Sequence, residues 1–268
     1  MTVHPELIAR VDVEGARYPT LMDKGIIITG GGSGIGASLV EHFADQGAKV
    51  GFIERDAGAA AQNAEDVARR TGNRPSYRVA DLRDIEALRQ CITELAEEVG
   101  PVRILVNNAG NDDRMPLEEV TPNYWDDRFA TNLRHQFFAA QSVIGGMAKS
   151  GGGSIINMGS ISWMRGAPGL IFYTAAKSAV MGMTKSLARE VGDRNIRVNS
   201  IAPGWVLTER QVERAKRIYQ GKFTEYLEAQ CIKEHLLPPD IARMALWLAA
   251  DDSRLVTAQT FIVDGGVV

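Results

Sequence analysis

The sequence predicts an α/β protein with one doubly wound, parallel sheet of seven strands and helices on both faces. Short apolar runs alternate with longer segments of helical periodicity, and no linker, composition shift or repeat divides the 268 residues. Strands that alternate with helices form parallel βαβ units with right-handed crossovers. Runs such as Gly25–Thr29 and Arg103–Val106 are apolar on both alternating faces, which indicates strands covered by helices on both sides.

The expected elements follow in order along the chain. The predicted strands are Gly25–Thr29, Lys49–Ile53, Ser76–Val79, Arg103–Val106, Ser154–Met158, Arg197–Ile201 and Thr260–Val263. The predicted helices are Ile35–Asp45, Ala57–Arg70, Ile85–Val99, Tyr124–Lys149, Tyr173–Val191 and Pro239–Ala249. Residues 1–22 lack periodicity and are expected to form an N-terminal extension that lies on the surface or is disordered, so the domain is expected at 23–268.

An irregular, charged stretch at about 205–237 separates the sixth strand from the last helix. Open α/β sheets bind ligands in the crevice outside the carboxyl ends of their strands. We therefore expect this stretch to form a lid over the substrate.

Composition excludes several classes of protein. Lys and Arg number 30 against 33 Asp and Glu, a net charge of −3 that argues against a nucleic-acid binder. Two separate cysteines, Cys91 and Cys231, exclude a disulfide scaffold, and four scattered histidines offer no metal-ligand spacing. No apolar run approaches a membrane span, and the acidic first residues lack the apolar core of a signal peptide. We expect a cytoplasmic protein without a metal.

A glycine-rich motif is the sharpest local signal. The motif TGGGSGIG at 29–36 follows the first predicted strand and opens a helix, which is the context that a dinucleotide-binding loop requires. Glycines let the backbone approach a pyrophosphate, and the helix N-terminus presents free N–H groups. No Gly-Lys-Ser/Thr follows, so the loop is not a kinase-type P-loop. The motif indicates a Rossmann-type fold, with the cofactor contacts expected at Gly30, Ser33, Gly34, Ile35 and Gly36.

The choice of dinucleotide depends on the end of the second strand. Glu54 stands twenty residues past Gly34, where a carboxylate accepts hydrogen bonds from ribose hydroxyls and repels a 2′-phosphate. Arg55 follows directly, and an arginine there is able to hold a 2′-phosphate. We expect NAD, with NADP as the alternative.

Three polar groups further along the chain suggest alcohol–carbonyl chemistry. Tyr173 and Lys177 are four residues apart and share one helical face. A nearby ammonium favours the phenolate and should lower the pKa of Tyr173 from its usual value near 10. The hydroxyl of Ser160 would then orient the substrate oxygen. Together they suggest a proton relay that works beside a nicotinamide.

The full set of motifs resembles the short-chain dehydrogenase/reductase family over about Lys24 to Gly266. Ser160 lies thirteen residues before Tyr173 in YTAAK, a spacing that this family shows. The resemblance implies a catalytic tetrad of Asn132, Ser160, Tyr173 and Lys177. It implies further cofactor contacts at Asp81, Leu82, Asn108, Ala109, Gly110, Pro203, Gly204, Val206 and Thr208, besides Glu54, Arg55, Tyr173 and Lys177. Asn132 would hold a water beside Lys177, and Glu54 stands where the family more often has Asp.

Within that family, several stretches are similar to bacterial D-xylose 1-dehydrogenases and related NAD-linked aldose dehydrogenases. These stretches include NNAGNDDR (107–114), NLRH (132–135) and GSISW (159–163). The resemblance implies oxidation of a pentose such as D-xylose or L-arabinose at C1 to the lactone. The expected substrate residues are Asn111, Asp112, Ser160, Ser162, Trp163, Tyr173, Trp205 and Gln211, with a tryptophan as the flat face for a sugar ring.

Other functions stay open at this point. A sugar acid or another secondary alcohol could use the same machinery, because Arg114, Arg165 or Arg210 could hold a carboxylate in a bidentate pair. A nucleotide-sensing module without turnover is the third reading, and the intact Asn–Ser–Tyr–Lys set argues against it. The resemblance also implies a homotetramer built through the helices predicted at Tyr124–Lys149 and Tyr173–Val191.

Overall fold

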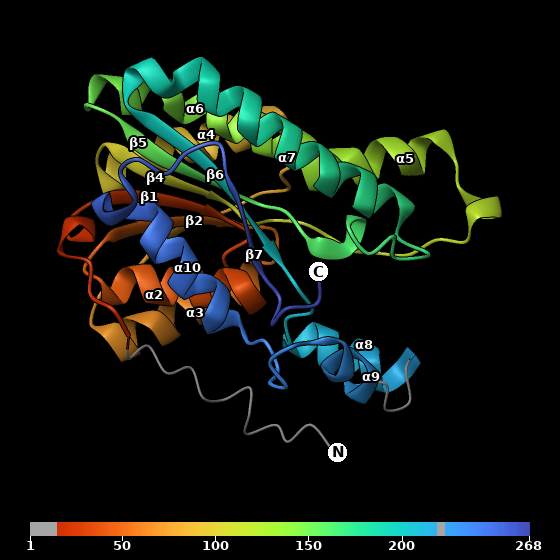
Figure 1. Cartoon of the computed structure of the whole chain (residues 1–268). Helices are drawn as coiled ribbons and strands as arrows, with labels where there is room; N and C mark the ends of the chain where they lie inside the picture. Colours follow the sequence, from red (N-terminus) through yellow and green to blue (C-terminus); the bar gives the residue numbers. More distant parts are fainter. Residues whose placement is uncertain (1–14, 219–222) are drawn as a thin grey trace.

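A computed structural model describes residues 15–218 and 223–268 as one α/β domain (Figure 1). Its sheet has seven parallel strands in the order β3-β2-β1-β4-β5-β6-β7. The strands are β1 Gly25–Thr29, β2 Lys49–Glu54, β3 Ser76–Val79, β4 Val102–Asn107, β5 Gly153–Met158, β6 Ile196–Pro203 and β7 Thr260–Val263. The order reverses between β1 and β4, which places a ligand crevice at their carboxyl ends. The predicted fold class is confirmed.

Helices cover both faces of the sheet in two layers (Figure 1). One layer contains α2, α3 and α10, and the other contains α4, α6 and α7. Their bounds are α2 Gly34–Asp45, α3 Ala57–Thr71, α4 Ile85–Val99, α6 His135–Lys149, α7 Ile171–Val191 and α10 Pro238–Ala249. The remaining helices are α5 Pro122–Phe129, α8 Glu209–Ile218 and α9 Phe223–Ala229.

The central position of strand β1 explains why its side chains do not alternate between apolar and polar. Ile26 and Ile28 belong to the core on the α2 side, whereas Ile27 belongs to the core on the α4 side. Successive residues of a strand point to opposite faces of the sheet. All three side chains are fully buried because helices cover both of those faces. A central parallel strand therefore contributes to two cores, and no polar alternation is left in its sequence.

Local caps define where the crossover helices begin. Asp56 accepts a hydrogen bond from the Ala59 N–H at the start of α3, at 3.0 Å. Asp84 does the same for the Glu86 and Ala87 N–H groups at the start of α4. A side-chain oxygen at the N-cap satisfies amides that have no partner within the helix. Both helices consequently start at the residue predicted.

The helix predicted at Tyr124–Lys149 is interrupted, and this part of the prediction is wrong. It consists of α5, a π-helical turn at Ala130–Arg134, and α6. The buried Asn132 side chain lies inside this turn and donates a 3.0 Å hydrogen bond to the Arg128 carbonyl. Such turns place an extra residue in the helix and often mark functional sites. Apolar periodicity alone does not show the extra residue.

The described part of the predicted N-terminal extension packs onto the domain. Leu21 is 1% exposed and belongs to the core on the α2 side, and Tyr18 packs against that core. The Tyr18 N–H donates a 2.8 Å hydrogen bond to Gln46 Oε1. The packed domain therefore begins before residue 23, whereas residues 1–14 lie outside the described residues. Among the helices that the structure describes, none combines the length and apolarity needed to cross a membrane.

We predict that Leu21→Ala lowers the free energy of unfolding by about 2–5 kcal/mol, since it removes a buried side chain and leaves a cavity. Chemical denaturation followed by circular dichroism measures the change. The matched control is Met22→Ala, because Met22 is 61% exposed and its truncation should cost no more than about 0.5 kcal/mol. Equal stability of the two variants would contradict the placement of Leu21 in the core.

Candidate active site

The glycine loop joins β1 to α2 in a conformation that only glycine tolerates. Gly30 and Gly34 have positive φ angles of 69° and 54°. A Cβ at Gly36 would lie 1.7 Å from the Gly30 carbonyl oxygen, so no side chain fits there. The loop leads directly into the first turn of α2, whose N–H groups have no partner within the helix. Ser33 is the N-cap of α2 and Ile35 lies in its first turn, and the arrangement suits a diphosphate held by backbone amides.

The loop after β4 is tied to the glycine loop by hydrogen bonds. Asn108 Nδ2 donates to the Gly30 carbonyl at 2.9 Å, and the Asn108 and Ala109 N–H groups donate to Thr29 Oγ1. The side chain of Asn108 therefore holds the two loops together. Sequence reasoning missed Thr29, although its hydroxyl at the end of a buried strand was a visible signal.

Carboxylates lie beside the glycine loop at the ends of β2 and β3. Glu54 Oε2 accepts a 3.0 Å hydrogen bond from the Gly32 N–H, and Oε1 accepts from Arg55 N and Asp56 N. Asp81 pairs with Arg83, whose guanidinium lowers the pKa of the carboxyl. Leu82 follows Asp81 and packs against the core on the α4 side. This edge accordingly offers one carboxylate, Glu54, beside the glycine loop and a second, Asp81, beyond it.

The stretch after β6 closes the other side of this region. A Cβ at Gly34 would lie 3.0 Å from Thr208 Cγ2, so Thr208 faces the glycine loop. The Leu207 N–H donates a hydrogen bond to the Leu236 carbonyl, and Val206 and Leu236 form an isolated parallel β-bridge. Pro203 ends β6, and Gly204 donates to the Val263 carbonyl. The predicted cofactor residues described so far thus lie near the glycine loop and the carboxyl ends of the neighbouring strands, an arrangement that suits a dinucleotide.

Tyr173 and Lys177 lie on one face of α7, as their spacing predicts. Lys177 is 2% exposed, and its Nζ donates a 2.8 Å hydrogen bond to the Met158 carbonyl at the end of β5. The same Nζ lies 5.6 Å from the centroid of the Tyr173 ring. Ser160 follows two residues after Met158, and its hydroxyl lies close enough to Tyr173 to lower the pKa of that phenol. The end of β5 and the first turns of α7 therefore bring the three side chains together.

The charges around Tyr173 differ from the sequence expectation. Burial of the phenol raises its pKa well above the usual value, the Asp112 carboxylate raises it further, and the Ser160 hydrogen bond opposes both. Burial also lowers the pKa of Lys177 to about 8. The expected lowering of the Tyr173 pKa is therefore wrong for the protein alone, because desolvation of the phenol and the Asp112 charge outweigh the opposing effects of Ser160 and Arg210.

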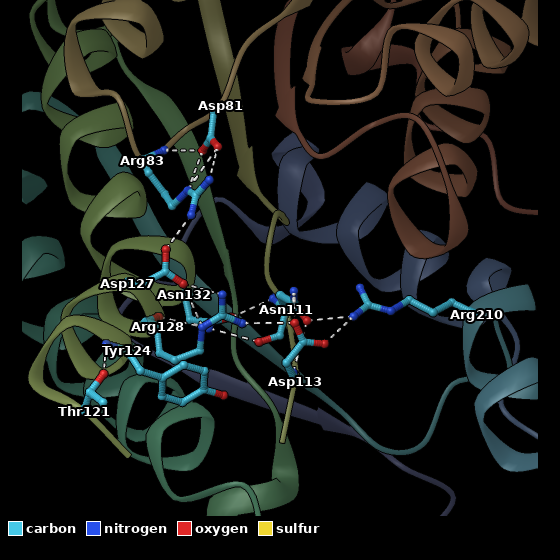
Figure 2. Close-up of polar contacts among 10 residues, drawn as sticks. All are labelled: Asp81, Arg83, Asn111, Asp113, Thr121, Tyr124, Asp127, Arg128, Asn132 and Arg210. Carbon is cyan, nitrogen blue, oxygen red and sulfur yellow. Dashed lines mark hydrogen bonds and ion pairs between the residues drawn. The ribbon is translucent and has the colours of Figure 1, made fainter. Parts of the chain in front are cut away.

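Asn132 meets Lys177 next to Gly110. A Cβ at Gly110 would lie 3.2 Å from Asn132 Oδ1 and 3.3 Å from Lys177 Nζ. Asn132 is fully buried, accepts a 2.8 Å hydrogen bond from the Asn111 N–H, and donates to the Asn111 carbonyl. Figure 2 shows Asn132, Asn111 and Arg128 grouped at this point. Asn132 consequently connects the π-helical turn to the loop after β4.

A buried polar network below the site escaped the sequence reasoning. Asn107 Nδ2 donates to Asn157 Oδ1 at 2.9 Å, and Asn157 Nδ2 donates to Thr184 Oγ1 at 3.0 Å. His135 is fully buried against the Ala109 carbonyl, and burial lowers its pKa to about 4. Asn157 and Thr184 stand inside apolar runs, and a polar residue in such a run was the available signal.

The predicted substrate residues come from three segments. Asp112 Oδ2 accepts a 2.9 Å hydrogen bond from Gln211 Nε2, and Trp205 Nε1 donates to Gln211 Oε1. In the segment after β5, Ser162 Oγ and Trp163 Nε1 are buried without a hydrogen-bond partner among the described residues. Such unpaired polar atoms suit a ligand with hydroxyl groups. Among all the residues that the structure describes, no cluster of three or more His, Cys, Asp or Glu side chains could hold a metal ion.

These features define an oxidoreductase with a dinucleotide crevice and an Asn–Ser–Tyr–Lys set beside it. Comparison with known proteins agrees with that class. A family model described as enoyl-(acyl carrier protein) reductase matches residues 30–268. The chain is 46% identical over 252 residues to a probable galactose dehydrogenase of Rhizobium meliloti, covering 94% of this chain and 98% of the relative. It is 44% identical over 257 residues to D-xylose 1-dehydrogenase of Caulobacter vibrioides, covering 95% and 99%.

Solved structures place the chain in the same class. L-sorbose reductase from Gluconobacter frateurii, in complex with NADPH and L-sorbose, matches with a TM-score of 0.86 and 28% identity, over 92% of this chain and 97% of that one. The chain belongs to the short-chain dehydrogenase/reductase family, whose enzymes use a nicotinamide cofactor to act on CH–OH donors.

We predict that Tyr173→Phe removes turnover by at least about 100-fold while the dinucleotide still binds, since it deletes only the phenolic oxygen. Stopped assays of reduced nicotinamide give the rate, and isothermal titration calorimetry gives the affinity for the dinucleotide. Retained turnover would show that another group takes the proton. Loss of binding together with loss of turnover would show that the substitution disturbs the crevice as a whole.

Proposed function

We propose that this protein oxidises an aldose, such as D-xylose or L-arabinose, at C1 to the lactone with NAD as the acceptor. Two relatives that cover nearly the whole chain are named as sugar dehydrogenases, and this observation carries the proposal. The segments beside Tyr173 support it, because Asp112, Gln211 and Ser162 offer several polar partners to a hydroxylated substrate. Trp163 and Trp205 provide flat apolar surfaces of the kind on which a sugar ring packs.

In this proposal the phenolate of Tyr173 takes the proton of the C1 hydroxyl and becomes the neutral phenol. Ser160 holds the same oxygen through its own hydroxyl, which lies close enough to Tyr173 to lower the pKa of that phenol. A nicotinamide held by the glycine loop would supply the acceptor for the C1 hydrogen and its electron pair. Lys177 holds a positive charge beside the phenol, since a pKa of about 8 leaves the ammonium protonated at neutral pH. That charge favours the phenolate once substrate and cofactor exclude water.

The arrangement of arginines favours an uncharged sugar over a sugar acid. Arg210 donates to Asn111 and pairs with Asp113 at 3.0 Å. Arg165 stacks on the Tyr226 ring at 5.0 Å, and Arg114 donates to the Pro168 carbonyl. The three arginines that could hold a substrate carboxylate are thus already engaged. A sugar acid or another secondary alcohol remains the second candidate, because arginines are able to exchange partners.

The contacts of Glu54 support the preference for NAD. Its carboxylate lies against Gly32, where the adenosine ribose of a dinucleotide on this loop would lie. A negative charge there accepts ribose hydroxyls and repels a 2′-phosphate. Arg55 is exposed and close enough to Asp81 to lower its pKa, so this arginine is the group that would favour NADP.

An apolar groove supports self-assembly into the proposed homotetramer. Phe129, Leu133, Phe137, Phe138 and Met183 line a cavity of about 370 Å³ on the face formed by α6 and α7. Phe137 is 43% exposed. Exposed apolar clusters of this kind mark surfaces that associate, and these are the helices expected at the interface.

The test of the proposed function is a substrate panel with NAD at a fixed concentration. D-xylose, L-arabinose and D-galactose should produce absorbance at the reduced-nicotinamide band, and Tyr173→Phe supplies the control without turnover. A panel of sugar acids and secondary alcohols runs beside the sugars. Turnover confined to that second panel would overturn the aldose assignment and favour the second candidate.

We further predict that Glu54→Ala weakens NAD binding and that Glu54→Gln improves NADP relative to NAD. Glutamine keeps an oxygen for the Gly32 N–H but removes the charge, so the ratio of kcat/KM for NADP over NAD should rise by about tenfold. Arg55→Ala is the matched substitution and should shift the ratio the other way. An unchanged ratio in Glu54→Gln would mean that Glu54 does not select the cofactor.

A further inference from the structure

The carboxylate of Asp112 lies at the junction of the lid and the catalytic residues. Its neighbour Asn111 is bonded through its backbone N–H and carbonyl to the buried Asn132 side chain. The backbone just before Asp112 is therefore fixed by the side chain of Asn132, one of the four predicted catalytic residues. The negative charge of Asp112 raises the pKa of the Tyr173 phenol, and no other charged side chain has a larger effect on that pKa.

The lid fixes one oxygen of Asp112 and leaves the other available. Oδ2 accepts from Arg214 Nη1 at 2.5 Å and from Gln211 Nε2 at 2.9 Å, both in α8. Oδ1 has only Arg210 Nη2 at 3.9 Å, which is beyond hydrogen-bond distance, among the residues that the structure describes. The side chain is consequently held in one orientation with an acceptor still open.

The surrounding arginines do not leave a net positive site. Asp113 takes Arg210 at 3.0 Å, Arg214 at 3.4 Å and Arg128 at 3.3 Å. Figure 2 shows Arg210 reaching from the α8 side to Asp113, with Arg128 on the opposite side. Arg128 also pairs with Asp127, which in turn pairs with Arg83. Each guanidinium of this cluster is thus matched by a carboxylate, and among the acidic side chains it is Asp112 that acts on the pKa of the Tyr173 phenol.

We infer that Asp112 is a specificity-determining residue that restricts the site to uncharged sugars. Its open oxygen accepts a hydroxyl of the aldose, and its charge disfavours a substrate that carries a carboxylate. Gln211 and Arg214 are positioning residues that hold Asp112 when α8 lies against the loop after β4. This inference rests on the proposed function and goes further, because it names the group that separates aldoses from sugar acids.

The test compares D-galactose with D-galacturonate, which differ only at C6, in the wild-type protein, Asp112→Asn and Asp113→Asn. Asparagine preserves the size of the side chain and an acceptor oxygen but removes the charge. The ratio of kcat/KM for galacturonate over galactose should rise by about tenfold in Asp112→Asn, the effect of one screened charge in such a site. Asp113→Asn loosens the same lid contacts without touching the charge at the phenol, so its ratio should equal that of the wild type.

A second readout separates a charge effect from a change of shape. The base form of Tyr173 is the active form in oxidation, and the Asp112 charge raises the pKa of that phenol. The acid limb of kcat/KM for galactose should therefore move to lower pH in Asp112→Asn and stay in place in Asp113→Asn. Equal ratios in Asp112→Asn and the wild type, or an equal rise in both variants, would overturn the inference.

The two proposals fail in distinguishable ways. Galactose turnover by the wild type with an unchanged ratio in Asp112→Asn removes the inference and leaves the proposed function in place. If no sugar is turned over, the proposed function fails, and the inference is judged by binding instead. Tryptophan fluorescence titrations of galactose and galacturonate then give the affinity ratio, which must rise in Asp112→Asn alone; an unchanged ratio overturns the inference.

Discussion

The burial of the Lys177 ammonium is the constraint on which the site depends. A buried charge is costly unless a hydrogen-bond acceptor compensates it, and here that acceptor is the Met158 carbonyl at the end of β5. The contact requires that β5 end at this residue and that α7 begin close enough for its second turn to face the strand. It also suits a glycine at position 110, since a Cβ there would lie in tight contact with Lys177 Nζ and Asn132 Oδ1. The lowered pKa of Lys177 is the remaining cost of this arrangement.

The two halves of the crevice use different kinds of polar group. On the cofactor side, backbone amides and neutral side chains dominate, with Asn108 and Thr29 tying the glycine loop to the loop after β4. On the lid side, carboxylates and guanidinium groups face each other across α8 and the segment from Asn111 to Asp113. Neutral groups keep a fixed geometry in a dry region at small cost, whereas exposed ion pairs exchange partners readily.

Sequence periodicity and motif context predicted the sheet, because those signals are local. All seven strands lie where the apolar runs predict, and three of them, β1, β3 and β7, have the predicted bounds. The helix starts at Asp56 and Asp84 were equally accessible, since an N-cap depends on neighbouring residues alone. The π-helical turn was not, because the extra residue is stabilised by Asn132 contacts with Arg128 and Asn111. The burial of Leu21 was not predicted for a related reason, since a single apolar residue in an irregular segment shows no periodicity.

In the candidate site, too, local features could be predicted from the sequence, whereas features that depend on the whole fold could not. Spacing on one helix brought Tyr173 and Lys177 together correctly, but the pKa expectation for the phenol failed because burial is a property of the whole fold. Arg214 was unpredictable as a partner of Asp112, since 102 residues separate them and the lid helix decides the pairing. The same reasoning bears on substrate choice. Arg210, Arg114 and Arg165 looked available for a carboxylate when only the sequence was considered, and each has a partner in the fold. The number of arginines near a site therefore says little about its preference for anions until the partners of those arginines are known, and here the carboxylates of Asp112 and Asp113 pair with the arginines of α8.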